Sequence, residues 1–164
     1  MWLGINLGTA FLASSVVGQF QGTIDRLVAL AVLMPIVAGM GGNAGTQVLA
    51  LMVRGLALGQ VGATNANALL WKELRVALLN GLLIGGIVGI ATWAWFGDHE
   101  LAAVIFAAML FNLVTAAVAG VGVPLLLRRM NIDPALAGGV ILTTVTDVMG
   151  FFSFLGLASL VLLR

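Results

Sequence analysis

Long apolar runs, separated by short polar or charged stretches, are the feature that most constrains the fold of this chain. Five such runs follow one another, at about residues 2–18, 27–53, 76–96, 101–127 and 134–163. About 20 apolar residues in a helix cross a bilayer core that is about 30 Å thick. The runs are too long for barrel strands and lack their alternation of apolar and polar residues. We therefore predict an all-α membrane protein, with five transmembrane helices in a single domain over residues 1–164.

Composition supports this class and excludes several others. Hydrophobic residues make up 62% of the chain and charged residues 8%, whereas a soluble domain carries roughly 25% charged residues. The surface must therefore face the lipid bilayer. A net charge of +1 gives no basis for binding nucleic acid, and the lack of cysteine excludes disulfide frameworks and thiolate metal sites.

The distribution of basic residues predicts the orientation of the chain. The connections after the second and fourth runs would share one side of the membrane, and the other side holds only Arg26 and Arg164. Lys and Arg concentrate on the cytoplasmic side of membrane proteins. We expect a cytoplasmic N-terminus, an external C-terminus and a location in the inner (plasma) membrane. The five basic residues on the predicted cytoplasmic side are Arg54, Lys72, Arg75, Arg128 and Arg129.

Asp147 is the one ionisable side chain in the interior of an apolar run. A charged residue at such depth costs about 3 kcal/mol on insertion scales, so it usually faces a pathway or a partner. Thr143 and Thr144 lie four and three residues before Asp147, and Gly150 lies three after it, on the same side of a helix. An all-oxygen set of this kind suits Mg²⁺ or Ca²⁺, whereas softer metals prefer His or Cys.

One carboxylate per chain is a sparse site for a metal ion. Mg²⁺ usually keeps several waters and is held by one or two carboxylates, and two chains on a two-fold axis would supply two. The alternative is that a threonine or asparagine of the same chain bonds to Asp147. An enzyme is not expected, because Asp147 has no charged partner within the runs and the single histidine, His99, lies in a predicted turn.

The second run is unusual because it combines Pro35 with many glycines, which weaken a helix. Asn43 and Gln47, four residues apart, add amide groups to it. Broken or loosened helices at membrane depth are tolerated where their backbone lines a watery cavity or is buried in protein. The alternative is a kinked helix whose amides bond to neighbouring helices, and the pattern leaves both possibilities open. The presence of two unusual runs, this one and the one with Asp147, favours a shared pathway.

Three further patterns predict helix contacts and one helix start. Gly81, Gly85 and Gly89 repeat every four residues, which predicts a closely packed neighbouring helix. Asn112 and Thr115 are expected to donate hydrogen bonds between helices. Asp133 and Pro134 have the residue types of an N-cap and a first helical residue.

Two long motifs resemble signatures of the MgtE family of magnesium channels or transporters. The first is P-I-V-A-G-M-G-G-N-A-G-T-Q, from Pro35 to Gln47, followed by Arg54. The second is Asp133-Pro134-Ala135 with T-V-T-D-V-M-G-F-F, from Thr144 to Phe152. The opening Trp2–Leu7 is also similar to the family's entry into its first span. The resemblance therefore covers essentially the whole chain.

The resemblance implies a homodimer whose pore runs along the two-fold axis, lined mainly by the second and fifth helices. Asp147 of both chains would hold a hydrated Mg²⁺, the transported ion, with further contacts from Thr143 and Thr144. Asp133 would lie at the cytosolic mouth. A narrow gate would form near Thr46, Ala50, Leu136 and Gly139. The pore-lining residues expected on this basis are Gly42, Asn43, Thr46, Ala50, Leu136, Gly139, Val140 and Gly150.

Relatives of this family also carry a cytosolic N-terminal domain and a CBS-domain pair that sense Mg²⁺. This sequence has no counterpart of either, which leaves room for a longer native chain that carries them. Two other functions stay open at this point. One is a carrier that couples a divalent cation to Na⁺ or H⁺, since a titratable group at the midplane serves both mechanisms. The other is a membrane scaffold in which Asp147 pairs with a partner helix.

Overall fold

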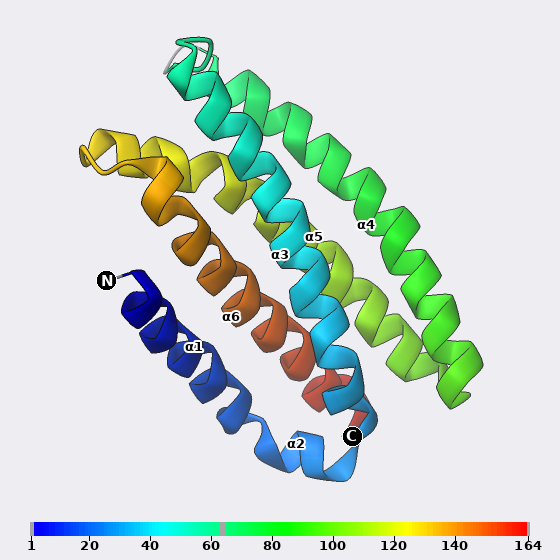
Figure 1. The fold of residues 1–164 in the computed structure, drawn as a ribbon. Helices are drawn as coiled ribbons and strands as arrows, with labels where there is room; N and C mark the ends of the chain where they lie inside the picture. Colours follow the sequence, from blue (N-terminus) through cyan, green and yellow to red (C-terminus); the bar gives the residue numbers. More distant parts are fainter. Residues whose placement is uncertain (1, 63–64, 164) are drawn as a thin grey trace.

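The computed structural model describes residues 2–62 and 65–163, and within them the chain forms helices and no strand. α3 to α6 are long and apolar enough to cross a membrane. α1, with 18 residues, is not among these candidate spans, so the count of five spans and the orientation remain predictions. In chain order the helices are α1 (Trp2–Gln19), α2 (Gln21–Arg26), α3 (Ala29–Ala57), α4 (Ala66–Phe96), α5 (His99–Arg129) and α6 (Pro134–Leu162) (Figure 1).

Helices extend beyond the apolar runs in two places. α4 begins at Ala66, well before the predicted start of the third span at residue 76. Hydrophobicity marks the part of a helix that lies at membrane depth, whereas alanine, leucine, lysine and glutamate before residue 76 favour helix as well. The connection predicted between the first and second spans contains the short helix α2.

α3 is an unbroken α-helix from Ala29 to Ala57, through Pro35 and the glycines. The predicted loosening of this run is therefore wrong. Gly41 and Gly45 are buried against side chains of α5 and α6, so the contact that their small size allows compensates for their low helix propensity.

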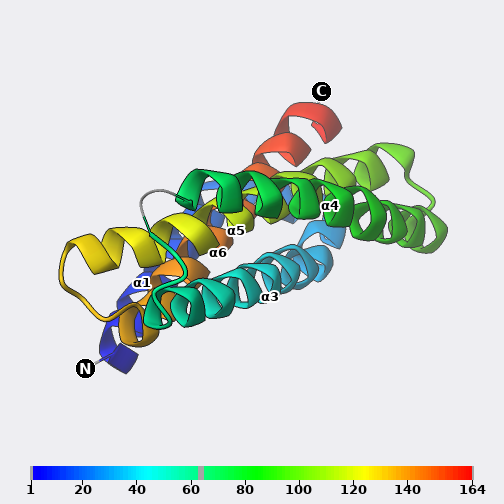
Figure 2. The same cartoon turned by 90° about the horizontal axis from the view of Figure 1, so that it is seen from above.

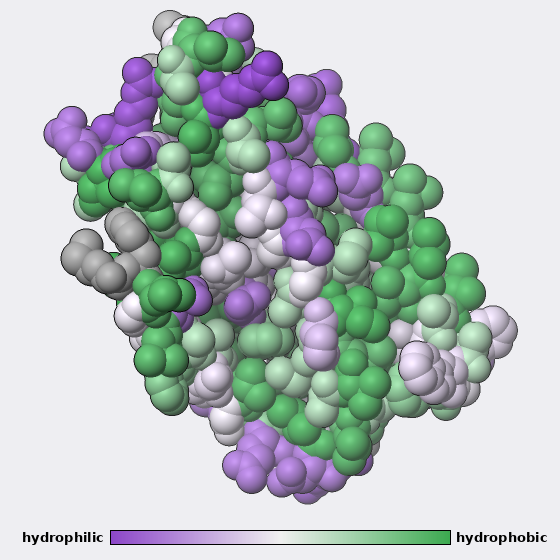
Figure 3. Space-filling model, in the orientation of Figure 1, coloured by the Kyte–Doolittle hydropathy of each residue, from purple (hydrophilic) through white to green (hydrophobic). Residues whose placement is uncertain are grey.

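α5 is the central helix of the bundle. It packs against α3, α4 and α6, while α1 lies on the outside and packs mainly against α6. The view from above shows α4 alongside α5, with α3 next to this pair (Figure 2). Hydrophobic residues cover most of the visible surface, and hydrophilic residues gather mainly at its ends (Figure 3).

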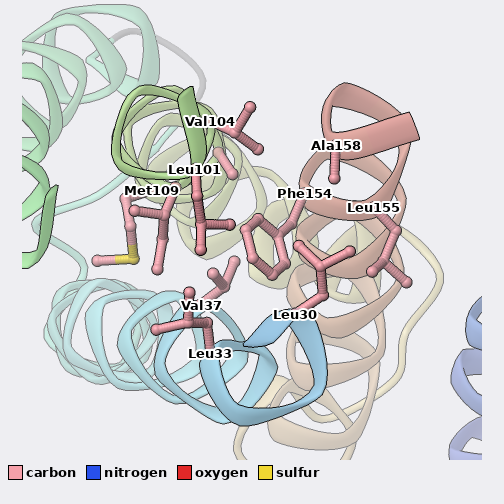
Figure 4. Close-up of a cluster of buried hydrophobic side chains, with 11 residues drawn as sticks. Leu30, Leu33, Val37, Leu101, Val104, Met109, Phe154, Leu155 and Ala158 are labelled. Atoms are coloured by element: carbon pink, nitrogen blue, oxygen red, sulfur yellow. The ribbon is translucent and has the colours of Figure 1, made fainter. Parts of the chain in front are cut away.

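The main apolar cluster joins α3, α5 and α6. Phe154 is fully buried there between Leu30 and Val37 of α3 and Leu101 and Met109 of α5 (Figure 4). Because lipid tails are as apolar as these side chains, their close van der Waals packing is what favours the contact.

The glycine repeat on α4 faces α5, as predicted. An added Cβ at Gly81 would overlap Leu110, and at Gly85 and Gly89 it would lie 3.3 Å from Phe106 Cδ2 and from the Ala102 carbonyl oxygen, respectively. This confirms the prediction of a close helix neighbour. The predicted start of α6 is also confirmed, because the Asp133 side chain accepts a hydrogen bond of 2.9 Å from the Ala135 N–H.

Candidate functional site

A seam of buried residues joins α3 to α6, which run antiparallel to each other. An added Cβ at Gly45 would lie 3.0 Å from Leu142 Cδ1, and one at Gly138 would lie 2.9 Å from Leu49 Cδ1. Residue numbers in these contacts rise along α3 as they fall along α6, as expected for antiparallel helices. The seam repeats every four residues, with Val37, Gly41, Gly45 and Leu49 on α3 and Gly138, Leu142, Thr146, Gly150 and Phe154 on α6.

The residues that come directly after seam residues in the sequence form one surface across both helices. Each lies about 100° around its helix from the preceding residue, because an α-helix has 3.6 residues per turn. In an antiparallel pair, this rotation turns both sets of residues to the same side of the seam. They are half-buried or exposed, and we call them the Asp147 face: Gly42, Thr46 and Ala50 on α3, with Gly139, Thr143 and Asp147 on α6.

Hydroxyl groups beside Asp147 donate within their own helix. Thr143 donates to the Gly139 carbonyl at 3.0 Å, and Thr144 donates to the Val140 carbonyl at 2.7 Å. Their oxygens therefore keep acceptor capacity toward the surface.

Asp147 itself is half-buried, and its carboxylate has no hydrogen bond or ion pair within residues 2–62 and 65–163. The alternative in which a threonine or asparagine of the same chain bonds to Asp147 is therefore not observed in the structure. The carboxylate is left available for a ligand or for a partner from outside the chain.

A hollow of about 350 Å³ lies between the first turns of α1 and of α6, next to the Asp147 face. Leu136, Gly139, Val140 and Thr143 line it from α6. α1 contributes Leu3 and Asn6, and sequence reasoning missed this contribution. The signal for it was present, since Asn6 is an amide within an apolar run.

The remaining predicted residues lie in different environments. Asp133 is exposed at the start of α6. Asn43 is exposed and shares a helical face with Gln47, one turn further along α3. Gly150, by contrast, lies on the seam and is buried, and an added Cβ there would be 2.7 Å from Asn112 Nδ2. The expectation that Gly150 lines a pore is therefore wrong, because its missing side chain makes room for α5.

Asn112 of α5 joins the two helices that carry the Asp147 face. Its side chain is fully buried between Gly41 and Gly150, and Nδ2 donates to the Val37 carbonyl oxygen at 2.9 Å. The predicted hydrogen bond between helices is thus confirmed for Asn112. It is wrong for Thr115, whose hydroxyl donates to the Phe111 carbonyl of its own helix at 2.9 Å.

The face of a single chain offers one carboxylate. Residues 2–62 and 65–163 contain no group of three or more His, Cys, Asp or Glu side chains that could enclose a metal ion. An ion at Asp147 would consequently need water or a second chain to complete its coordination.

Comparison with known proteins identifies the family. The MgtE family model, described as a divalent cation transporter, matches residues 34–157. This chain belongs to the MgtE family. The matched range covers nearly all of α3 and α6, including every residue of the Asp147 face. The family is one of transporters, which agrees with the expectation that the chain is not an enzyme.

Curated members of the MgtE family match nearly the whole chain. The magnesium transporter MgtE of Bacillus subtilis (strain 168) is 30% identical over 158 residues, which are 96% of this chain and 35% of the relative. The magnesium transporter MgtE of Thermus thermophilus is 32% identical over 161 residues, 98% of this chain and 36% of the relative. The chain thus spans about a third of the length of these relatives.

Proposed function

We propose that this chain forms the transmembrane pore of a Mg²⁺ transport protein, with Asp147 as the carboxylate that binds the ion. The observation that carries this proposal is the half-buried Asp147, which has no partner within the described residues and lies on a surface shared by α3 and α6. The similarity to curated magnesium transporters supports Mg²⁺ as the ion.

A hydrated ion fits the chemistry of this surface. Mg²⁺ loses water reluctantly and is usually held by one or two carboxylates with several waters retained. Around Asp147 the protein offers the hydroxyl oxygens of Thr143 and Thr144, which suit hydrogen bonds from those waters.

A homodimer completes the site. Two Asp147 faces meeting on a two-fold axis would supply two carboxylates, which balance the charge of one Mg²⁺. The pore would then run between the two chains. Its lining would include Gly42, Asn43, Thr46, Ala50, Leu136, Gly139 and Val140.

In this arrangement the gate lies nearer the start of α6, at Thr46, Ala50, Leu136 and Gly139, with Asp133 at the mouth. The distribution of basic residues supports a cytoplasmic mouth, a cytoplasmic N-terminus and an external C-terminus in the plasma membrane. Because the chain spans about a third of its relatives, a longer native chain with cytosolic Mg²⁺-sensing domains is part of the proposal.

A carrier that couples Mg²⁺ to Na⁺ or H⁺ is the second candidate. The observation that favours it is again Asp147, which has no partner among the described residues, since a carboxylate at membrane depth can exchange a proton for a metal ion. Flux in liposomes separates the two mechanisms. A channel gives Mg²⁺ uptake driven by membrane potential alone, whereas a carrier needs a Na⁺ or pH gradient.

The test of the site is Mg²⁺ flux into liposomes that contain the chain with Asp147→Asn. The expected result is flux at the level of empty liposomes, with the dimer intact by cross-linking. Glu100→Gln is the control, because Glu100 is exposed in the first turn of α5 and should leave flux unchanged. Normal flux through the Asp147→Asn variant would rule out the proposed role of Asp147.

A further inference from the structure

A second polar site lies in a cleft between α3 and α4, away from the Asp147 face. The cleft has a volume of about 180 Å³, and Leu113 and Ala117 of α5 form its floor. Contacts of α3 show on which side of the bundle this cleft lies. Val48, the residue before the seam residue Leu49, packs against α5, since an added Cβ at Gly120 would lie 2.7 Å from Val48 Cβ. Residues of the Asp147 face each come directly after a seam residue, whereas Val48 comes directly before one. The two sites therefore lie on opposite sides of the seam.

Glu73 of α4 is the charged residue of this cleft. It is 6% exposed, although Lys72 and Arg75 beside it are exposed. Its side chain lines the cleft from α4. Burying a carboxylate is costly unless it is well paired, which makes this environment unusual for a residue in a polar stretch.

The partner that Glu73 has within its chain is a weak one. Lys72 Nζ lies 3.7 Å from Glu73 Oε1, and the lysine side chain is 68% exposed. Adjacent residues on a helix do not face each other, so the lysine has to bend back to reach the carboxylate. Because the lysine is largely exposed and its nitrogen lies 3.7 Å away, we expect this pairing to contribute little and to be easily displaced.

Two amide side chains line the same cleft. Asn80 lies two turns after Glu73 on α4, and Gln47 comes from α3. The two helices make few direct contacts with each other, and both pack on α5. In Figure 3, hydrophilic residues lie between α3 and α4 within an otherwise hydrophobic surface.

The donor set selects the kind of ligand. One carboxylate and two amide oxygens are hard donors that suit hydrated divalent cations, and no His or Cys lines the cleft to bind a softer metal. A volume of about 180 Å³ is well above the roughly 10–15 Å³ that one water needs, so the cleft has room for an ion with bound water.

We propose that this cleft is a second cation site, which takes one hydrated divalent cation against Glu73. The amides of Gln47 and Asn80 accept hydrogen bonds from the waters of the ion, and Lys72 swings out to the surface when the ion enters. Glu73 lies just before the apolar run that starts at residue 76, and Asn80 lies just within it. The cleft therefore extends from the predicted membrane boundary near Glu73 to the middle of α4 at Asn80. The proposal does not depend on the role of Asp147.

The test is Mn²⁺ binding, followed by electron paramagnetic resonance, to the chain in phosphatidylcholine nanodiscs. All variants carry Asp147→Asn, which removes the other candidate site. The expected result is one Mn²⁺ per chain, with an affinity that falls about 10- to 100-fold in Gln47→Leu and Asn80→Leu and at least as far in Glu73→Gln. Lys72→Gln should bind Mn²⁺ severalfold more tightly, because it removes the competing ammonium group. Glu100→Gln is the matched control and should not differ.

Several outcomes would overturn the proposal. One is the absence of bound Mn²⁺ in the Asp147→Asn chain, and another is binding that Glu73→Gln leaves unchanged. If Lys72→Gln fails to tighten binding, Glu73 serves to pair with Lys72 and not with a cation. If phosphatidylethanolamine in the nanodisc abolishes Mn²⁺ binding, the cleft belongs to the lipid ammonium group. Circular dichroism checks that each variant is folded. If Glu73→Gln does not fold, the Lys72→Gln variant still tests the proposal.

Discussion

Asp147 and Glu73 are two carboxylates of one chain in contrasting surroundings. Asp147 stands alone within an apolar run, on a surface formed by α3 and α6, and has no partner within the described residues. Glu73 stands among charged residues in the sequence, yet it is more deeply buried and lies in a cleft with two amides. The comparison teaches that a buried carboxylate is a candidate for ligand binding because its burial is costly. The number of charged residues near it in the sequence does not identify it.

The sharpest way to break this comparison is to remove each carboxylate in turn and measure Mg²⁺ flux in liposomes. Asp147→Asn should reduce flux to background, since Asp147 is the one carboxylate within the apolar part of the proposed path, beyond Asp133 at its mouth. Glu73→Gln should leave most of the flux, because its cleft lies on the other side of the seam from the Asp147 face. Equal losses in the two variants would show that both carboxylates serve one pathway.

The second comparison uses adjacent glycines on α3. Gly41→Ala should lower the free energy of unfolding by about 1–3 kcal/mol, because the added methyl overlaps the Asn112 amide in a packed contact. Gly42→Ala meets no atom within 4 Å in the chain and gains up to about 1 kcal/mol of helix propensity. Thermal unfolding in detergent, followed by tryptophan fluorescence, measures both. If the two variants unfold alike, the seam does not hold α3 against its neighbours.

The contribution of Asn112 should be smaller than the effect of Gly41→Ala. Asn112→Leu removes a hydrogen bond worth about 0.6 kcal/mol on average within membranes, and it also removes a buried acceptor, Oδ1, that has no partner among the described residues. We expect the free energy of unfolding to fall by less than about 1 kcal/mol as a result. The same thermal assay measures this, and a larger loss would mean that Oδ1 bonds to a water or to a second chain.

The smallest effect is expected for the glycines of α4. Gly85→Ala places a methyl 3.3 Å from Phe106 Cδ2, a tight contact that a small shift of the ring can relieve. Its cost should be about 1 kcal/mol or less, near the low end of the range for overpacking. Gly86→Ala, with no atom within 4 Å, is the control. A cost above that of Gly41→Ala would show that the α4–α5 contact is the more rigid of the two.

Much of the fold could be predicted from the sequence, because a membrane requires each spanning segment to satisfy its own backbone hydrogen bonds. Apolar length alone thus located the main parts of α3 to α6. Asp147 and Asn112 were identifiable for a related reason, since a polar side chain in an apolar run needs a partner or a function.

Other features depend on contacts between helices that no local pattern encodes. Glu73 reads as part of a solvated stretch, and its burial follows from the position of α5 behind α3 and α4. Gly150 shares a helical side with Asp147. A small rotation of α6 about its axis decides whether Gly150 contacts Asn112 or lies at the surface. Thr115 can bond within its own helix as readily as across to another, so its partner could not be assigned.

The interlocked seam between α3 and α6 also limits how the proposed pore can change its width. Leucines of each helix fill the spaces left by glycines of the other, and Asn112 is wedged between the two. A slide of one helix along the other would force side chains into backbone at several levels at once. We therefore expect each chain to move as a single rigid wall, so that opening and closing change the separation and tilt of two such walls and leave the shape of each unchanged.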